Sequence, residues 1–237
     1  MPQTRCLVLG SCTGQKDDLN CPVELKLKEE YFSDPTQLLR AEHRVKRWLK
    51  PAGEMYTGRQ HTLMMSGVHR LREGFKPASF DVSIVSAGYG LVSEAKLIAP
   101  YNITFQGKGL PWARERGAAL NIPTMTRKLL SKYQVVFFLL GKEYLSSLGD
   151  PSTPEPGQKF IYFGTAIERF RLPRTGVIVL PAAQAEATRY GGAGVTGIKG
   201  RMFDLFAKGM ADHPERWNTF LEDRTAKTLL DVMSKAR

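Results

Sequence analysis

The chain has 237 residues, of which 42% are hydrophobic and 24% charged, and its formal net charge is +11 at pH 7. This composition is typical of a folded globular protein and too apolar for a disordered one. The mean hydropathy is -0.27, and the longest apolar run, 135–140, is far too short to cross a bilayer. We therefore expect no membrane span.

The first residues and the cysteines predict a compartment. Residues 1–12 hold one Arg before a short apolar run, without the longer apolar stretch or the small-residue cleavage site of a signal peptide. Cys6, Cys12 and Cys21 are odd in number and lack C-x-x-C spacing, which argues against a disulfide framework and against a zinc site. We expect a reduced, cytoplasmic protein without a metal or another cofactor.

The charge favours a polyanionic partner. The chain has 34 Lys and Arg against 23 Asp and Glu. Such an excess of positive charge raises both the affinity and the association rate for nucleic-acid phosphates. Solubility alone is the other explanation. The segment 38–50 comes nearest to a basic amphipathic helix of the membrane-binding kind, and we expect no membrane partner.

The first half of the chain alternates predicted strands and helices. In order they are a strand at 5–10, a loop at 11–18, a segment at 21–32 that becomes helical toward its end, a helix at 35–50, a helix at 57–73, a strand at 80–87 and a tight loop at 88–91.

The second half continues the alternation. In order we predict a helix at 112–133 that breaks at Pro123, a strand at 134–140, a Pro/Gly-rich loop at 149–158, strands at 159–163 and 176–180, a Gly-rich turn at 191–200, and helices to the end.

This alternation predicts an α/β fold: a single domain, 1–237, with a central, mostly parallel or mixed sheet flanked by helices. We interpret 149–158 as a surface loop. Open sheets of this kind bind ligands at the carboxyl ends of their strands. Three loops lie at such ends, namely 11–18, 86–91 and 141–145.

The loop 11–18 (SCTGQKDD) offers backbone N–H groups and hydroxyls to an anion or a base edge, and Lys16 adds charge. It lacks the P-loop pattern. A plain strand-to-helix turn is the alternative. Cys12 is more typical of a small buried thiol than of a nucleophile, because no His lies nearby in sequence.

The second segment carries two aromatic rings. Tyr89 is flanked by glycines and Tyr101 follows a proline. Such rings at strand ends can stack a planar ligand, and stacking on a base contributes roughly 1–3 kcal/mol. Glu94 and Asn102 are the polar groups best placed beside them. Alternatively, both tyrosines belong to the core.

Two helix starts add basic residues. In the third loop, Lys142 opposes the helix dipole, although a solvated Lys142–Glu143 pair is the simpler interpretation. The stretch 191–201 contains G-x-G-x-x-G, but not after the first strand, where a dinucleotide site needs it. Lys199 and Arg201 there favour a phosphate or DNA-backbone clamp. A loop that caps a helix is the alternative.

Five segments together resemble the YaaA family of peroxide-stress proteins, and they occur in the family's order: LVLGSCTGQK, MYTGRQ, SAGYGLVSEAKLIAPYN, LLGKEYL and GIKGRMFDLF. This resemblance implies a compact α/β fold that binds DNA. It also implies a shared cleft lined by Lys16, Tyr56, Gln60, Tyr89, Tyr101, Tyr144 and Arg201. The chain departs from the family pattern at Gly88 and Asn102.

The chain also resembles bacterial anti-phage DNA glycosylases built on this kind of scaffold. That resemblance implies excision of glucosylated hydroxymethylcytosine from double-stranded phage DNA, which leaves abasic sites. It implies no cofactor and no obligate protein partner. An oxocarbenium-like state needs a carboxylate, the extruded base needs stacking rings, and the phosphates need cations.

Under this resemblance the candidate residues fall into three groups. They are Glu94, Asn102 and Asp17 for catalysis; Ser11, Cys12, Gln15, Tyr89, Tyr101 and Tyr144 for base binding; and Lys16, Arg59, Lys142, Lys199 and Arg201 for the DNA backbone.

Two other functions compete with excision. One is a non-catalytic DNA-binding stress protein of the YaaA type, and the other is a nucleoside or nucleotide hydrolase or transferase. The net charge of +11 argues against the small-molecule enzyme.

Overall fold

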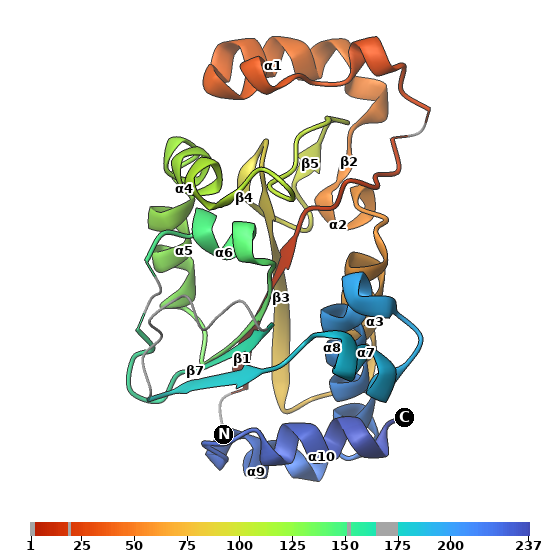
Figure 1. Ribbon diagram of the computed structural model, residues 1–237, viewed down its shortest axis with the longest axis vertical. Helices are drawn as coiled ribbons and strands as arrows, with labels where there is room; N and C mark the ends of the chain where they lie inside the picture. Colours follow the sequence, from red (N-terminus) through yellow and green to blue (C-terminus); the bar gives the residue numbers. More distant parts are fainter. Residues whose placement is uncertain (1–2, 19, 151–152, 165–174) are drawn as a thin grey trace.

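The computed structural model describes residues 3–18, 20–150, 153–164 and 175–237. Its centre is a six-stranded sheet (Figure 1). The strands are β1 (Thr4–Ser11), β3 (Ala78–Ser86), β4 (Gly90–Ser93), β6 (Val135–Leu139), β7 (Lys159–Phe163) and β8 (Val177–Leu180). A separate antiparallel pair joins β2 (Lys50–Pro51) to β5 (Leu97–Ile98).

The strand order is β4-β3-β1-β6-β7-β8, and every neighbouring pair is parallel except β3 with β4. The predicted α/β class with a mostly parallel sheet is confirmed. Strands on both sides of 149–158 belong to this one sheet; of that segment, 151–152 lie outside the described residues. Parallel strands are covered on both faces, which explains their continuous apolar runs; all of β6 is buried.

Helices cover both faces of the sheet. The helices of the described residues are α1 (Pro35–Arg44), α2 (Ala52–Met55), α3 (Arg59–Gly74), α4 (Leu110–Ala119), α5 (Ile122–Leu130), α6 (Lys142–Ser147), α7 (Gln184–Tyr190), α8 (Gly194–Asp212), α9 (Trp217–Glu222) and α10 (Lys227–Lys235). Figure 1 shows α3, α7 and α8 on one side and α4, α5 and α6 on the other, with α1 at the top of the view. No helix in the described ranges combines the length and apolar content that a bilayer span requires.

The pair α3 and α8 packs unusually closely. A Cβ added at Gly200 would lie 2.2 Å from the backbone oxygen of Gln60, and one at Gly67 would lie 3.1 Å from the Cα of Asp204. The backbones therefore touch where side chains would otherwise separate them. This contact explains Gly200 in α8 and Gly67 in α3, although a glycine costs a helix about 0.5–1 kcal/mol relative to Ala.

Several predicted boundaries are wrong for local reasons. The helix predicted at 35–50 ends at Arg44 and continues as a 3-10 turn, and 21–32 forms short 3-10 turns. The predicted break at Pro123 falls at Asn121, whose φ is 54°, because proline is accepted in the first turn of α5. The Gly-rich turn predicted at 191–200 is helical from Gly194.

Candidate functional site

A cavity of about 570 Å³ lies at the carboxyl edge of the sheet, and we call it the edge cavity. The loop after β1, the start of α3, the start of α6 and the start of α8 enclose it. Seven residues predicted from sequence line it, namely Ser11, Cys12, Gln15, Arg59, Gln60, Tyr144 and Lys199. The structure thus brings together residues from four distant segments of the chain.

Gln60 fixes the base of the edge cavity. Its Nε2 donates to the Ser11 Oγ at 3.1 Å and to the Leu139 carbonyl at 2.9 Å. These two bonds join the first turn of α3 to the ends of β1 and β6. Ser11 is buried at 8% exposure, so its hydroxyl is held in one place beside the cavity.

Tyr144 forms one wall. Its hydroxyl donates to the Cys12 carbonyl at 2.6 Å and lies 3.3 Å from the Cys12 Sγ. The Thr104 Oγ1 lies 2.9 Å from the same hydroxyl. Burial raises the pKa of Tyr144 well above its ordinary value, so the hydroxyl stays protonated and serves as a fixed polar group.

Glu143 and Lys199 bring opposite charges to the edge cavity. Glu143 is 9% exposed, and the Lys142 Nζ lies 3.7 Å from its Oε1. Burial lowers the pKa of Lys199, and the charge of Glu143 opposes that shift. Within the described residues the Lys199 ammonium has no hydrogen-bond or ion-pair partner. This lining therefore contains a carboxylate and an uncommitted cation.

The starts of α3 and α8 add positive potential. Neither Gly58, before α3, nor Ala193, before α8, supplies a side-chain cap, so the first backbone N–H groups keep their partial positive charge. The Arg59 Nη2 donates to the Gly192 carbonyl and links the two starts. Such an arrangement suits a phosphate or another anion.

A smaller cavity of about 280 Å³ lies on the other side of the loop after β1, where Gln15, Lys16 and Asn102 line it. The Lys16 Nζ donates to the Thr13 carbonyl at 3.0 Å and lies 4.4 Å from the centre of the Tyr101 ring. Burial lowers the pKa of Lys16. Lys16 therefore points inward, contrary to its predicted role on the DNA backbone.

The two predicted stacking rings lie in an aromatic cluster. Tyr101 is 0% exposed, and its hydroxyl lies 2.7 Å from both the Tyr56 hydroxyl and the Ser86 Oγ. Tyr89 packs edge-on against Tyr101, with ring centres 5.5 Å apart, and donates to the Glu42 carboxylate. The expected stacking of a base on Tyr101 is wrong for this conformation, because that residue is fully buried.

Glu94 is not at the carboxyl edge. We expected it there because it follows the strand 80–87, but β4 runs back along β3, and the Glu94 N–H donates to the Val82 carbonyl at 3.3 Å. Its carboxylate accepts from Arg72, with an Nη1–Oε2 distance of 2.9 Å. The hairpin thus places Glu94 away from the edge cavity, beside Val82 in the middle of β3.

The other predicted catalytic residues are also separate from the edge cavity. Asn102 is exposed and lines the smaller cavity. The Asp17 carboxylate pairs with Lys50, and the Asp17 N–H donates to the Met55 carbonyl at 2.8 Å. The structure therefore does not bring Glu94, Asn102 and Asp17 together.

Lys142 and Arg201, both predicted to contact the DNA backbone, lie in different surroundings. Lys142 is exposed at the start of α6, beside Glu143. The Arg201 Nη1 lies 3.2 Å from the Asp204 Oδ2, and its Nε is buried without a partner in the described part of the chain. Arg201 therefore belongs to the interface of α3 and α8, not to the edge cavity.

The sequence interpretation missed Glu143. We interpreted Lys142 and Glu143 as a solvated pair, yet Glu143 comes two positions after Gly141, which ends a fully buried strand. That position at a carboxyl strand end was the signal that could have identified it. Among the described residues, no cluster of three or more His, Cys, Asp and Glu is arranged to hold a metal ion.

The chain was compared with known proteins. Neither a scan against protein-family models nor a search of the curated proteins finds a match.

Proposed function

We propose that this protein is a DNA glycosylase that hydrolyses the N-glycosidic bond of a modified base extruded into the edge cavity. The observation that carries the proposal is the buried Glu143 carboxylate, which shares that cavity with Lys199 and Arg59. Bond cleavage at C1′ develops positive charge on the sugar. A carboxylate stabilises that charge or activates the attacking water.

The other lining groups support the same reaction. The free N–H groups at the start of α8, together with Lys199, suit a phosphate beside the target sugar. Ser11 and Tyr144 present fixed hydroxyls for the edge of the base. A volume of about 570 Å³ is in the range of sites that take small organic groups.

Duplex DNA is the proposed partner, and the cytoplasm is the proposed compartment. The net charge of +11 favours a polyanion. The described cysteines Cys6, Cys12 and Cys21 are free thiols, as a reducing compartment allows. The resemblance to anti-phage glycosylases suggests glucosylated hydroxymethylcytosine as the excised base and defence against phage as the role.

The test is base release under single-turnover conditions from three duplexes of one sequence. They carry cytosine, hydroxymethylcytosine or glucosylated hydroxymethylcytosine, and mass spectrometry counts free bases while an aldehyde probe counts abasic sites. We expect release from modified DNA and none from cytosine DNA. Tight binding without release from any duplex would favour the non-catalytic DNA-binding protein.

A nucleotide hydrolase is the second candidate, and one observation favours it. The uncommitted Lys199 and two helix starts meet in the edge cavity, and this also suits the terminal phosphate of a mononucleotide. The same assay on the modified nucleoside 5′-monophosphate separates the two functions. Release from the mononucleotide as fast as from DNA would support the hydrolase.

A further inference from the structure

We propose that Val195 is the wedge that enters the base stack and holds the target base out of the duplex. This inference rests on the proposed glycosylase function. Val195 lies in the first turn of α8, lines the edge cavity and is 48% exposed. A wedge has to be apolar, exposed and next to the pocket that receives the base, and Val195 meets these three conditions.

The exposure of Val195 is unusual for its place. The large apolar side chains that are most exposed among the described residues are Val23, Leu25, Leu39, Leu97, Met125, Val179 and Val195. Of these, Val195 lines the edge cavity. A β-branched side chain is also a poor choice for an exposed helix turn, because it loses rotamer freedom there. Packing therefore does not explain a valine at this position.

The platform beneath Val195 is held in place. The preceding Gly192 and Gly194 have φ values of 77° and 59°, a region that glycine enters without strain. The Arg59 guanidinium donates to the Gly192 carbonyl and ties this loop to α3. Val195 thus projects from a fixed turn, and its β-branched side chain adds little freedom of its own.

The neighbours of Val195 are those that a wedge needs. Thr196 follows it and lines the same cavity, and Lys199 lies one turn later on α8. A hydroxyl, an ammonium and free helix N–H groups are contacts for DNA phosphates. Phosphates held there would place the base stack against Val195.

A wedge offsets part of the free-energy cost of base extrusion. Extruding a base costs a few kcal/mol of lost stacking and pairing, and an empty gap would let the base return. Proteins fill such gaps with apolar side chains inserted between base steps. Val195 would fill the gap while the base occupies the adjacent edge cavity.

The decisive variant is Val195→Ala, assayed on one strand in duplex and in single-stranded form. We expect release from the duplex to fall by about tenfold, since extrusion from a stack is what the wedge supports. Release from the single strand should stay within about twofold, because it has no paired stack to hold open. Val195→Leu should restore release from the duplex. Val179→Ala, on the exposed residue of β8, is the matched control and should match the wild type.

A second readout does not depend on catalysis. A duplex with 2-aminopurine beside the modified base becomes more fluorescent when the stack opens. We expect the wild type to raise this fluorescence on binding and Val195→Ala to leave it unchanged. If the wild type opens the stack but releases no base, the glycosylase proposal fails and the wedge stands. Unchanged release from the duplex by Val195→Ala, equal loss on both DNA forms, or a normal fluorescence rise would overturn the wedge.

Discussion

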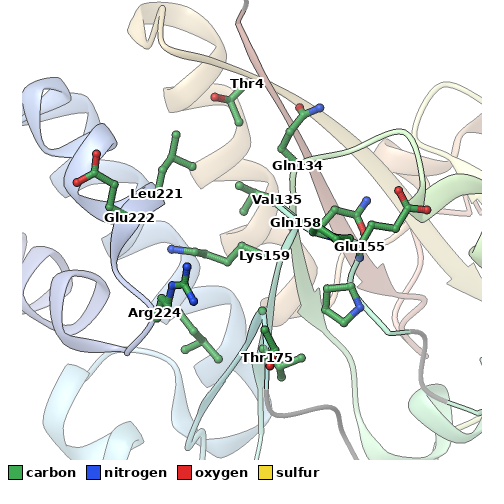
Figure 2. Close-up of a pocket in the computed structure, with 16 residues that line it drawn as sticks. Thr4, Gln134, Val135, Glu155, Gln158, Lys159, Thr175, Leu221, Glu222 and Arg224 are labelled. Atoms are coloured by element: carbon green, nitrogen blue, oxygen red, sulfur yellow. The ribbon is translucent and has the colours of Figure 1, made fainter.

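The two ends of the sheet carry cavities that differ in what their polar groups do. The edge cavity, at the carboxyl end, has a volume of about 570 Å³. The cavity at the amino end is larger, about 920 Å³, and lies between the starts of β6, β7 and β8 and the end of α9 (Figure 2). Volume alone would favour the amino end.

Two long polar side chains of the amino-end cavity, Lys159 and Gln158, are engaged in structural bonds. The Lys159 ammonium, which Figure 2 shows reaching from β7 toward the α9 side, donates to the carbonyls of Phe220 and Asp223. The Gln158 Nε2 donates to two backbone carbonyls, one of which is that of Tyr133 at 2.8 Å. Burial lowers the pKa of Lys159 to about 8. These side chains hold the end of α9 and the loop before β6.

The edge cavity differs because part of its chemistry remains available. The Lys199 ammonium has no partner within the described ranges, and Glu143 contacts only the exposed Lys142 among the ion pairs described there. We infer that a buried carboxylate beside a cation without a partner in the described residues, rather than volume, distinguishes the edge cavity from the amino-end cavity.

The sharpest test of this difference is Glu143→Gln. Release of the modified base should fall about a hundred- to thousand-fold, the usual loss when one electrostatic stabiliser of about 2.7–4 kcal/mol is removed. DNA affinity should stay unchanged, because the basic groups remain. The matched control is Glu155→Gln in the amino-end cavity, which should release base like the wild type. Near wild-type release by Glu143→Gln would remove the carboxylate from the mechanism.

The converse change is Lys159→Met. The free energy of unfolding should fall by about 1–3 kcal/mol, because the buried Phe220 carbonyl and the half-buried Asp223 carbonyl lose their donor. Base release at 25 °C should not change. Urea denaturation measures the first and the single-turnover assay the second, with Lys142→Met as the exposed control for stability. A loss of activity without a loss of stability would make the amino-end cavity functional.

His61 gives a pH test behind the edge cavity. It follows Gln60 in α3, its Nε2 lies 2.8 Å from the Gly53 carbonyl, and its Nδ1 is buried without a partner in the described residues. Burial lowers the pKa of His61 below its ordinary 6.5. Below pH 6.5, His61 is protonated in the unfolded chain but stays neutral in the folded chain. The free energy of unfolding therefore falls as the pH falls, by at most about 1.4 kcal/mol per pH unit.

The measurement is urea denaturation between pH 7 and pH 5. His61→Gln should flatten the fall in stability, and His213→Gln, at an exposed site, should leave it unchanged. An equal slope in the wild type and His61→Gln would mean that His61 binds its proton equally well in both states.

The smallest expected effect concerns salt. Lys199→Ala should reduce the slope of log affinity against log salt by about 1, as the loss of one phosphate contact does. Arg201→Ala should leave the slope unchanged, because Asp204 already holds its guanidinium. Fluorescence anisotropy on one duplex at several salt concentrations measures both. A lower slope for Arg201→Ala alone would place the phosphates on the other part of α8.

The predictable part of the fold was the part that depends on local composition. The strands at 5–10 and 134–140 are predictable because parallel strands buried on both faces are plain apolar runs, and the strand at 80–87 is predictable from its alternation of apolar and polar residues. The carboxyl-end rule also selected three loops, of which two reach the edge cavity.

The unpredicted part depends on contacts between distant segments. The chain reverses at Gly90 because β4 pairs with β3, and this reversal moves Glu94. The sequence of the four-residue β4 does not by itself predict that pairing. Glycines disfavour helices, so the sequence predicts a turn at 191–200, although α8 begins at Gly194 and Gly200 touches the backbone of α3. Glu143 becomes a candidate site residue only in the folded structure, where α8 places Lys199 in the same cavity.

The contact of Gly200 with Gln60 also determines how this protein can move. With backbone against backbone, α8 cannot slide or rotate on α3 without a clash, since packed interiors resist compression. Lys199 precedes Gly200 in α8, and Gln60 lies opposite Gly200 in α3. The side chains of Lys199 and Gln60 therefore belong to one rigid helix pair. The edge cavity is therefore organised when the chain folds, before any substrate arrives. The Arg59 bond to the Gly192 carbonyl ties the loop before α8 to the same unit, so the helix pair and this loop together give the edge cavity a fixed shape.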